Sequence, residues 1–133
     1  MPSNAIVVLL VDDQEIIGEA IRRILVGEED MAYHFCKDPT QAIEMAIQHS
    51  PTVILQDLMM PDLDGFLLLR YFRANAKTKE IPLIVLSSKD DEEIRKKVME
   101  LGATDYMIKI PKKDELINKV RYYSQQYVSR GQL

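Results

Sequence analysis

Short apolar runs alternate five times with segments of helical periodicity, and this alternation constrains the fold more than any other feature of the chain. The runs are too short for buried helices, and they end at turn signals or polar residues, as buried strands do. The expected strands are Ile6–Val11, Met31–Cys36, Thr52–Gln56, Leu83–Leu86 and Thr104–Ile108. A repeated strand–helix order predicts an α/β fold in which a parallel sheet carries helices on both faces, joined by right-handed crossovers.

Capping signals place the helices between these strands. Asp38 and Pro39 begin the second helix, with Gln41 positioned to complete a capping box. Asp90 is the expected cap of the fourth helix, with Glu93 three residues later. The remaining helices are expected after Asp13 until Gly27, from Asp64 to Ala74 and from Lys112 onward.

Composition narrows the class of protein. The chain has 133 residues, a formal charge of -4 and a single cysteine, Cys36, which excludes a disulfide framework. An acidic chain does not suggest nucleic-acid binding, although residues 109–133 hold six Lys/Arg against two Asp/Glu. No apolar run approaches the roughly 20 residues of a membrane span, and no basic leader is visible. We therefore expect one cytoplasmic domain that binds neither nucleic acid nor membrane.

Polar residues follow four of the five expected strands. Asp12 and Asp13 come after the first, Asp57 after the third, Ser87 after the fourth and Lys109 after the fifth. The carboxyl ends of parallel strands share one edge of the sheet, where open α/β folds bind ligands. Three carboxylates there repel one another unless a cation is present, and hard oxygen ligands suit Mg²⁺. Lys109 and Ser87 would neutralise and hydrogen-bond a tetrahedral anion on Asp57, which indicates phosphoryl transfer.

Each of these residues has an ordinary explanation when taken alone. Asp12 or Asp13 could cap the first helix, Ser87 could be a turn residue and Lys109 could be solvated. The functional interpretation depends on all of these residues falling at one edge of the sheet. The sheet itself was predicted from the apolar runs, independently of these polar residues.

The sequence resembles a response-regulator receiver domain over about residues 5 to 125. The matching pieces are Leu10-Val11-Asp12-Asp13, Asp57-x-x-Met60-Pro61-x-x-Asp64-Gly65, Leu86-Ser87, and Gly102-Ala103 through to Lys109. The resemblance is greatest to the receivers of Wsp-type diguanylate cyclase response regulators, on Asp12-Asp13-Gln14, Thr52 to Asp57, and Arg121-Tyr122-Tyr123-Ser124. It implies a flavodoxin-like, doubly wound five-stranded sheet with strand order 2-1-3-4-5.

The resemblance also implies roles for individual residues. Asp57 would accept a phosphoryl group from a histidine kinase or a phosphotransfer protein. Asp13, Asp57 and the Met59 carbonyl would bind Mg²⁺, with Asp12 acting through water. Ser87 and Lys109 would contact the phosphoryl group. Tyr106 matches the aromatic residue that turns inward when Ser87 moves, although half-buried strand packing would also explain it, and Met59 and Lys89 match positions that tune the phosphoryl lifetime.

One departure from the family pattern concerns the loop after the fifth strand. The family usually has Lys followed by Pro across a cis peptide, whereas this chain has Lys109-Ile110-Pro111. The sequence leaves open whether the Lys109–Ile110 bond is cis or the loop is rebuilt. The direction of the Lys109 side chain and the shape of the adjacent surface are open for the same reason.

Three functions are compatible with these observations. The first is a signalling module that is switched by phosphorylation and turns over no metabolite. Its fourth helix, fifth strand and fifth helix would form the output surface. This surface would control a partner protein, an effector such as a diguanylate cyclase domain, or the formation of a homodimer. The second is an interaction module that does not depend on phosphorylation, and the third is a flavodoxin-like cofactor binder, which lacks a phosphate-binding loop here. We expect the receiver to span residues 1–127 and residues 128–133 to be a tail or a linker.

Overall fold

The computed structural model describes residues 5–131 as five strands and five α-helices in alternation, with one additional 3-10 turn. The strands are β1 (Ile6–Val11), β2 (Met31–Cys36), β3 (Val53–Asp57), β4 (Leu83–Ser87) and β5 (Asp105–Ile108). The helices are α1 (Glu15–Leu25), α2 (Ala42–His49), α3 (Gly65–Ala74), α4 (Glu92–Glu100) and α5 (Lys113–Ser129), and the 3-10 turn is Pro39–Gln41. All five strands fall where the alternation predicts them.

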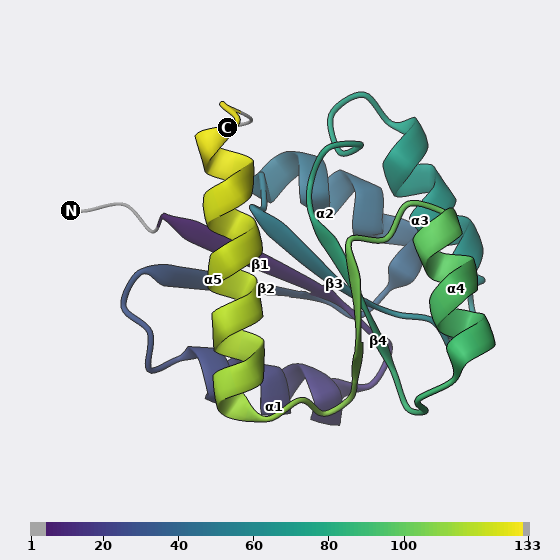
Figure 1. Ribbon diagram of the computed structural model, residues 1–133, viewed down its shortest axis with the longest axis horizontal. Coiled ribbons are helices and arrows are strands. Elements are labelled where there is room, and N and C mark those ends of the chain that lie inside the picture. The colour runs from purple at the N-terminus through teal and green to yellow at the C-terminus, as the bar shows by residue number, and fades with distance from the viewer. Residues whose placement is uncertain (1–4, 132–133) are drawn as a thin grey trace.

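The strands form one parallel sheet in the order β2-β1-β3-β4-β5, which confirms the expected fold. Figure 1 shows α1 and α5 on one side of this sheet and α2, α3 and α4 on the other. The order of the strands places β3 at the centre, between β1 and β4. The carboxyl ends of β1, β3, β4 and β5 therefore lie next to one another.

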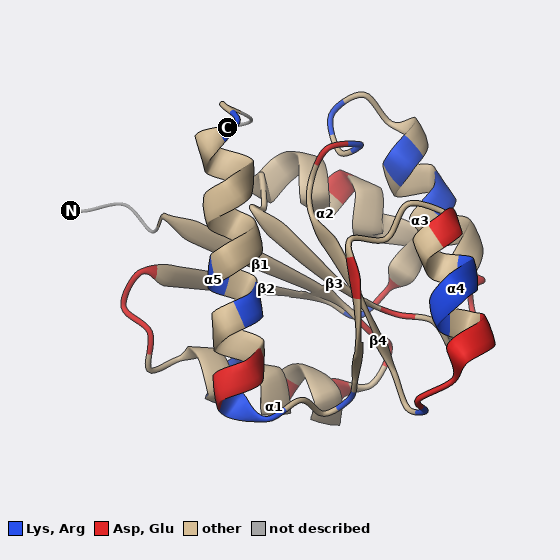
Figure 2. Cartoon of the chain, viewed as in Figure 1, with Lys and Arg blue, Asp and Glu red and all other residues tan. Residues whose placement is uncertain are grey.

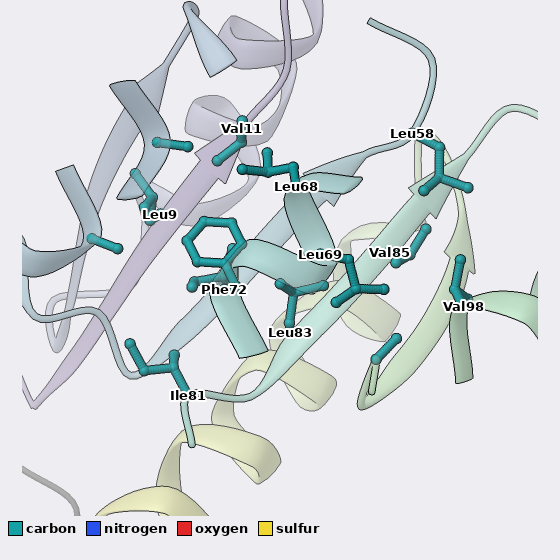
Figure 3. Packing of buried hydrophobic residues seen from close by; sticks show 14 of the residues in the cluster. Leu9, Val11, Leu58, Leu68, Leu69, Phe72, Ile81, Leu83, Val85 and Val98 are labelled. Carbon is teal, nitrogen blue, oxygen red and sulfur yellow. The ribbon is translucent and has the colours of Figure 1, made fainter. Parts of the chain in front are cut away.

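Each face of the sheet has its own apolar core, because β1, β3 and β4 are apolar on both faces. On the α2–α4 face, Figure 3 shows side chains of α3 packed against β1 and β4; among the labelled residues are Leu68, Leu69, Phe72, Leu9, Val11 and Leu83. On the opposite face, α1 and α5 cover Val8, Leu10, Leu55, Ile84 and Leu86. Continuous apolar runs of this kind are typical of parallel strands that are buried on both faces.

The structure corrects one predicted cap and one predicted capping box. Asp91, not Asp90, caps α4, since its carboxylate accepts hydrogen bonds from the backbone N–H groups of Glu93 and Ile94. Asp38 caps as predicted, but the turn that follows is 3-10 and the α-helix begins only at Ala42, so the predicted capping box with Gln41 is not formed. Acidic residues occupy the first turns of α4 and α5, where they complement the helix dipole (Figure 2).

The C-terminal helix continues to Ser129, two residues beyond the predicted end of the domain. Within residues 5–131, no helix combines the length and the apolar character that a membrane crossing requires. On α5, the Ser124 hydroxyl forms a buried hydrogen bond with the Thr52 hydroxyl, over an O–O distance of 2.8 Å. This contact joins α5 to the residue that precedes β3.

The stacked imidazoles of His34 on β2 and His49 on α2 lead to a prediction of pH-dependent stability. Their ring centroids lie 3.8 Å apart, and burial together with the neighbouring His49 lowers the pKa of His34 from its usual 6.5. A lowered pKa means that the unfolded chain binds this proton more readily, so stability is lost as the pH falls below 6.5. When the pH is lowered from about 7.5 to about 5.5, we expect the Tm of the wild type to fall further than the Tm of His34→Phe. Equal losses in the two proteins would contradict the prediction.

Candidate functional site

The predicted polar residues meet at the carboxyl edge of the sheet. Asp57 and Ser87 are the last residues of β3 and β4, while Asp12 and Lys109 directly follow β1 and β5. The parallel registers set Asp57 beside Leu86, and Ser87 beside Ile108. Strand pairing alone therefore brings together residues that are as many as 97 positions apart in the sequence.

The Lys109 ammonium group bridges two buried carboxylates. Its Nζ atom lies 3.1 Å from Asp12 Oδ2 and 3.1 Å from Asp57 Oδ1, and the Lys109 side chain is only 11% exposed. Asp12 and Asp57 are buried as well. The change from the usual Lys-Pro pair to Lys109-Ile110 therefore leaves the lysine directed into the acidic cluster.

Burial and charge act together on these groups. Burial, aided by the charge of Asp57, raises the pKa of Asp12, although the Gln14 N–H and Lys109 oppose this effect. For Lys109, burial favours the neutral amine, but the Asp12 and Asp57 carboxylates outweigh it and raise the lysine pKa. Lys109 is consequently held as a cation at neutral pH.

Asp13 completes a group of three carboxylates that fits a divalent cation. One oxygen from each of Asp12, Asp13 and Asp57 lies within 4.8 Å of the others. The Oδ1 atom of Asp13 is buried and has no hydrogen-bond partner among the described residues. Buried carboxylate oxygens normally have partners, and hard oxygen donors are the preferred ligands of Mg²⁺. The donor set and the unpartnered oxygen therefore both fit a Mg²⁺ site.

The loop between β3 and α3 closes one side of the site. Gly65 begins α3 in direct contact with Leu58, so that a Cβ atom at Gly65 would lie 2.5 Å from the Leu58 Cα and carbonyl oxygen. The Asp64 carboxylate caps α3 by accepting a hydrogen bond from the Phe66 N–H. Met59, in the same loop and two residues after Asp57, is 76% exposed.

Tyr106 is buried more completely than the half-buried strand packing that the sequence suggested. Its side chain is 2% exposed, and its hydroxyl donates a 2.6 Å hydrogen bond to the Lys89 carbonyl. The Lys89 N–H in turn approaches Ser87 Oγ at 3.3 Å. The Arg95 guanidinium lies 4.7 Å from the centre of the Tyr106 ring. Ser87 and Tyr106 are thus connected through the backbone of Lys89.

The loop after β5 follows one of the two backbone paths that the sequence left open at Lys109. The Lys109–Ile110 peptide bond is cis, which answers the question that the sequence left open. The Lys109 N–H donates a 2.8 Å hydrogen bond to the Ser87 carbonyl, while the Ile110 side chain is exposed.

Two residues near the site were not singled out from the sequence. Gln56 is fully buried beside Asp57 and donates a hydrogen bond to the Gly65 carbonyl. A polar residue inside an otherwise apolar strand was a signal that could have marked it. Arg95 contacts Tyr106 from α4, and nothing in the local sequence indicates that contact.

Comparison with known proteins agrees with this geometry. The response regulator receiver domain family matches residues 8–121. The chain belongs to this family. It is therefore a receiver domain of the kind found in two-component response regulators.

Curated relatives of this receiver include two regulators that are about twice its length. It is 31% identical over 114 residues to the response regulator MprA of Mycobacterium leprae, covering 86% of this chain and 49% of that protein. It is 30% identical over 128 residues to the transcriptional regulatory protein DegU of Brevibacillus brevis, covering 92% of this chain and 51% of that protein. The receiver thus spans about half the length of these relatives.

Solved receiver structures have the same fold. The receiver domain of the Francisella response regulator 1452 is 30% identical, with a TM-score of 0.79 over 90% of this chain and 97% of that one. The BeF3-activated receiver domain of Klebsiella pneumoniae RstA is 26% identical, with a TM-score of 0.78 over 89% and 97% of the two chains. The Mn²⁺-bound response regulator Rcp1 is 26% identical, with a TM-score of 0.70 over 86% and 88%.

Proposed function

We propose that Asp57 accepts a phosphoryl group from a histidine kinase or a phosphotransfer protein, and that this modification switches the receiver between two states. The observation that carries the proposal is the position of the Lys109 ammonium group, 3.1 Å from both the Asp12 and the Asp57 carboxylates. A fixed cation beside a nucleophilic carboxylate neutralises charge where a phosphoryl group would arrive. Ser87, at the end of the neighbouring strand, offers a hydroxyl donor to the same group.

The reaction is a transfer between two protein side chains. A carboxylate oxygen of Asp57 forms the new bond to phosphorus, and the bond from phosphorus to the donor's histidine nitrogen breaks. The electron pair of that bond leaves with the nitrogen, and water later hydrolyses the acyl phosphate to restore Asp57. Such a receiver acts on itself and turns over no metabolite.

Mg²⁺ is the cofactor that this chemistry requires. Asp12, Asp13, Asp57 and the Met59 carbonyl are the residues that would hold it, with Asp12 acting through water. A bound Mg²⁺ neutralises the charge that gathers between the incoming phosphoryl oxygens and the carboxylates. The likeness to Mn²⁺-bound Rcp1 supports a divalent cation in a receiver of this fold.

Ser87 and Tyr106 are the proposed switch, and the surface formed by α4, β5 and α5 is the proposed output. The hydrogen bond from Tyr106 to the Lys89 carbonyl joins the aromatic side chain to the segment that follows Ser87. A phosphoryl group that draws in Ser87 would bias the population of the inward Tyr106 conformation. Met59 and Lys89, which follow Asp57 and Ser87 by two residues each, are the proposed modulators of the phosphoryl lifetime.

The proposal is tested with beryllofluoride, which mimics a phosphoryl group on a carboxylate. In the presence of Mg²⁺ we expect amide NMR signals to shift at the site and also around Ser87, Tyr106 and α4. The Asp57→Asn variant should show none of these shifts, because an amide replaces the carboxylate. Identical spectra of the wild type with and without beryllofluoride would overturn the proposal and favour an interaction module that does not depend on phosphorylation.

The chain spans about half the length of two regulators that it resembles, which supports an effector as one of the proposed partners. We infer that residues 1–127 form a cytoplasmic receiver and that residues 128–133 lead toward an effector, such as the diguanylate cyclase domain of Wsp-type regulators. A separate target protein and a phosphorylation-dependent homodimer are the other proposed outputs. Size-exclusion chromatography with light scattering would test the homodimer: a mass that doubles with beryllofluoride in the wild type, but not in Asp57→Asn, is the expected result.

A further inference from the structure

Gln56 is a polar residue in an apolar layer of the sheet. The registers place Val11, Gln56, Val85 and Tyr106 in one row across β1, β3, β4 and β5. The other three members of this row belong to the apolar core on the α2–α4 face. Gln56 is 0% exposed and directly precedes Asp57.

The carboxamide of Gln56 is only partly satisfied. Its Nε2 atom donates a 2.7 Å hydrogen bond to the Gly65 carbonyl and a longer one, of 3.3 Å, to the Asp57 carbonyl. Its Oε1 atom is buried without a hydrogen-bond partner among the described residues. An unsatisfied buried acceptor destabilises the folded state, whereas an apolar side chain of the same shape avoids this penalty. The stability of the core therefore does not explain a glutamine at this position.

The hydrogen bond to Gly65 does have a structural consequence for the site. Gly65 is the first residue of α3, and its Cα is packed against the backbone of Leu58. The Gln56 side chain thus joins the start of α3 to β3, next to Asp57. The contact between Gly65 and Leu58 holds the two ends of the loop together. Met59 lies within the loop that these two contacts close.

We propose that Gln56 is a positioning residue, which fixes the loop of residues 58–64 so that the Met59 carbonyl is held beside Asp57 for Mg²⁺. This inference rests on the proposed function of Asp57. The orientation of groups around metal ligands is set by neighbours of this kind, and their loss typically weakens metal affinity about 10- to 100-fold. Burying the Oε1 atom without a partner lowers the stability of the fold, and this placement of the loop is what the chain gains in return.

The test is the Gln56→Met variant. Methionine is unbranched and of similar length, but it lacks the Nε2 donor of both hydrogen bonds and the unpartnered Oε1 acceptor. We expect a Tm equal to or above that of the wild type, together with a Kd for Mg²⁺ about tenfold weaker by isothermal titration calorimetry. The rate of phosphorylation from acetyl phosphate at limiting Mg²⁺ should fall in parallel. A purely structural role would not produce weaker metal binding in an equally stable protein.

Thr78→Val is the matched control. The Thr78 hydroxyl is also fully buried and donates a 2.7 Å hydrogen bond to a backbone carbonyl, that of Phe72, near the opposite end of α3. We expect this variant to lose stability while its affinity for Mg²⁺ stays that of the wild type.

If the wild type binds Mg²⁺ and is phosphorylated, three results would overturn the role of Gln56 and leave the proposed function of Asp57 standing. They are an unchanged Mg²⁺ affinity in Gln56→Met, a loss of stability that accompanies the weaker binding, and a failure of both Gln56→Met and Gln56→Leu to fold. A wild type that takes no phosphoryl group would instead overturn the proposed function, and this inference with it.

Discussion

Replacing Lys109 by Met is expected to destabilise the Mg²⁺-free protein by about 3 kcal/mol, because it leaves buried carboxylates without their cation. Asp12 and Asp57 both contact the Lys109 ammonium at 3.1 Å, and both are buried. Without Lys109 these two carboxylates face each other and Asp13 with no cation between them. Urea denaturation at neutral pH measures the effect.

Added Mg²⁺ should recover part of the stability lost in Lys109→Met, since an ion that binds only the folded state stabilises it. Lys119→Met is the control, because the ion pair of Lys119 with Asp105 is 36% exposed on the lysine side. The Asp105 side chain is 14% exposed, so the pair is partly open to solvent, and its loss should cost about 1 kcal/mol, less than the loss of Lys109. If Lys109→Met lost no more stability than Lys119→Met, the charge balance assigned to the acidic cluster would be wrong.

The Gly65→Ala substitution is expected to cost about 2–3 kcal/mol, because the new methyl group overlaps the chain backbone. Its Cβ would lie 2.5 Å from both the Cα and the carbonyl oxygen of Leu58, and neither atom can rotate away. The start of α3 must therefore move away from β3 and carry with it the loop that contains Met59. We also expect the affinity for Mg²⁺ to fall about tenfold.

Gly27→Ala provides the comparison for this substitution. A Cβ atom at Gly27 would meet nothing within 4 Å, so this variant should stay within about 0.5 kcal/mol of the wild type. Urea denaturation and calorimetric titration with Mg²⁺ measure both variants. A Gly65→Ala protein as stable as Gly27→Ala would contradict the close packing of α3 on Leu58.

The strand positions and the edge that carries the site could be predicted because they depend on local pattern and on topology. Parallel strands buried on both faces have a distinct apolar signature, and their common direction places Asp12, Asp57, Ser87 and Lys109 at one edge. The cap of α4 could not be predicted in the same way: Asp90 and Asp91 are adjacent acids, and only the observed start of α4 at Glu92 selects Asp91.

Long-range side-chain contacts could not be predicted, because no local pattern encodes them. Arg73 donates hydrogen bonds to the carbonyls of Gly102, Lys79 and Ile81, and so joins the ends of three segments. The pairing of Gln56 with Gly65 depends in the same way on how closely α3 approaches β3.

The central claim is that Asp57 is the phosphoacceptor, and intact-mass spectrometry after incubation with acetyl phosphate and Mg²⁺ tests it most directly. We expect the wild type to gain the mass of one phosphoryl group and to lose it slowly by hydrolysis, and Asp57→Asn to gain none. A wild type that gains no mass, or an Asp57→Asn variant that gains the same mass as the wild type, would contradict the account.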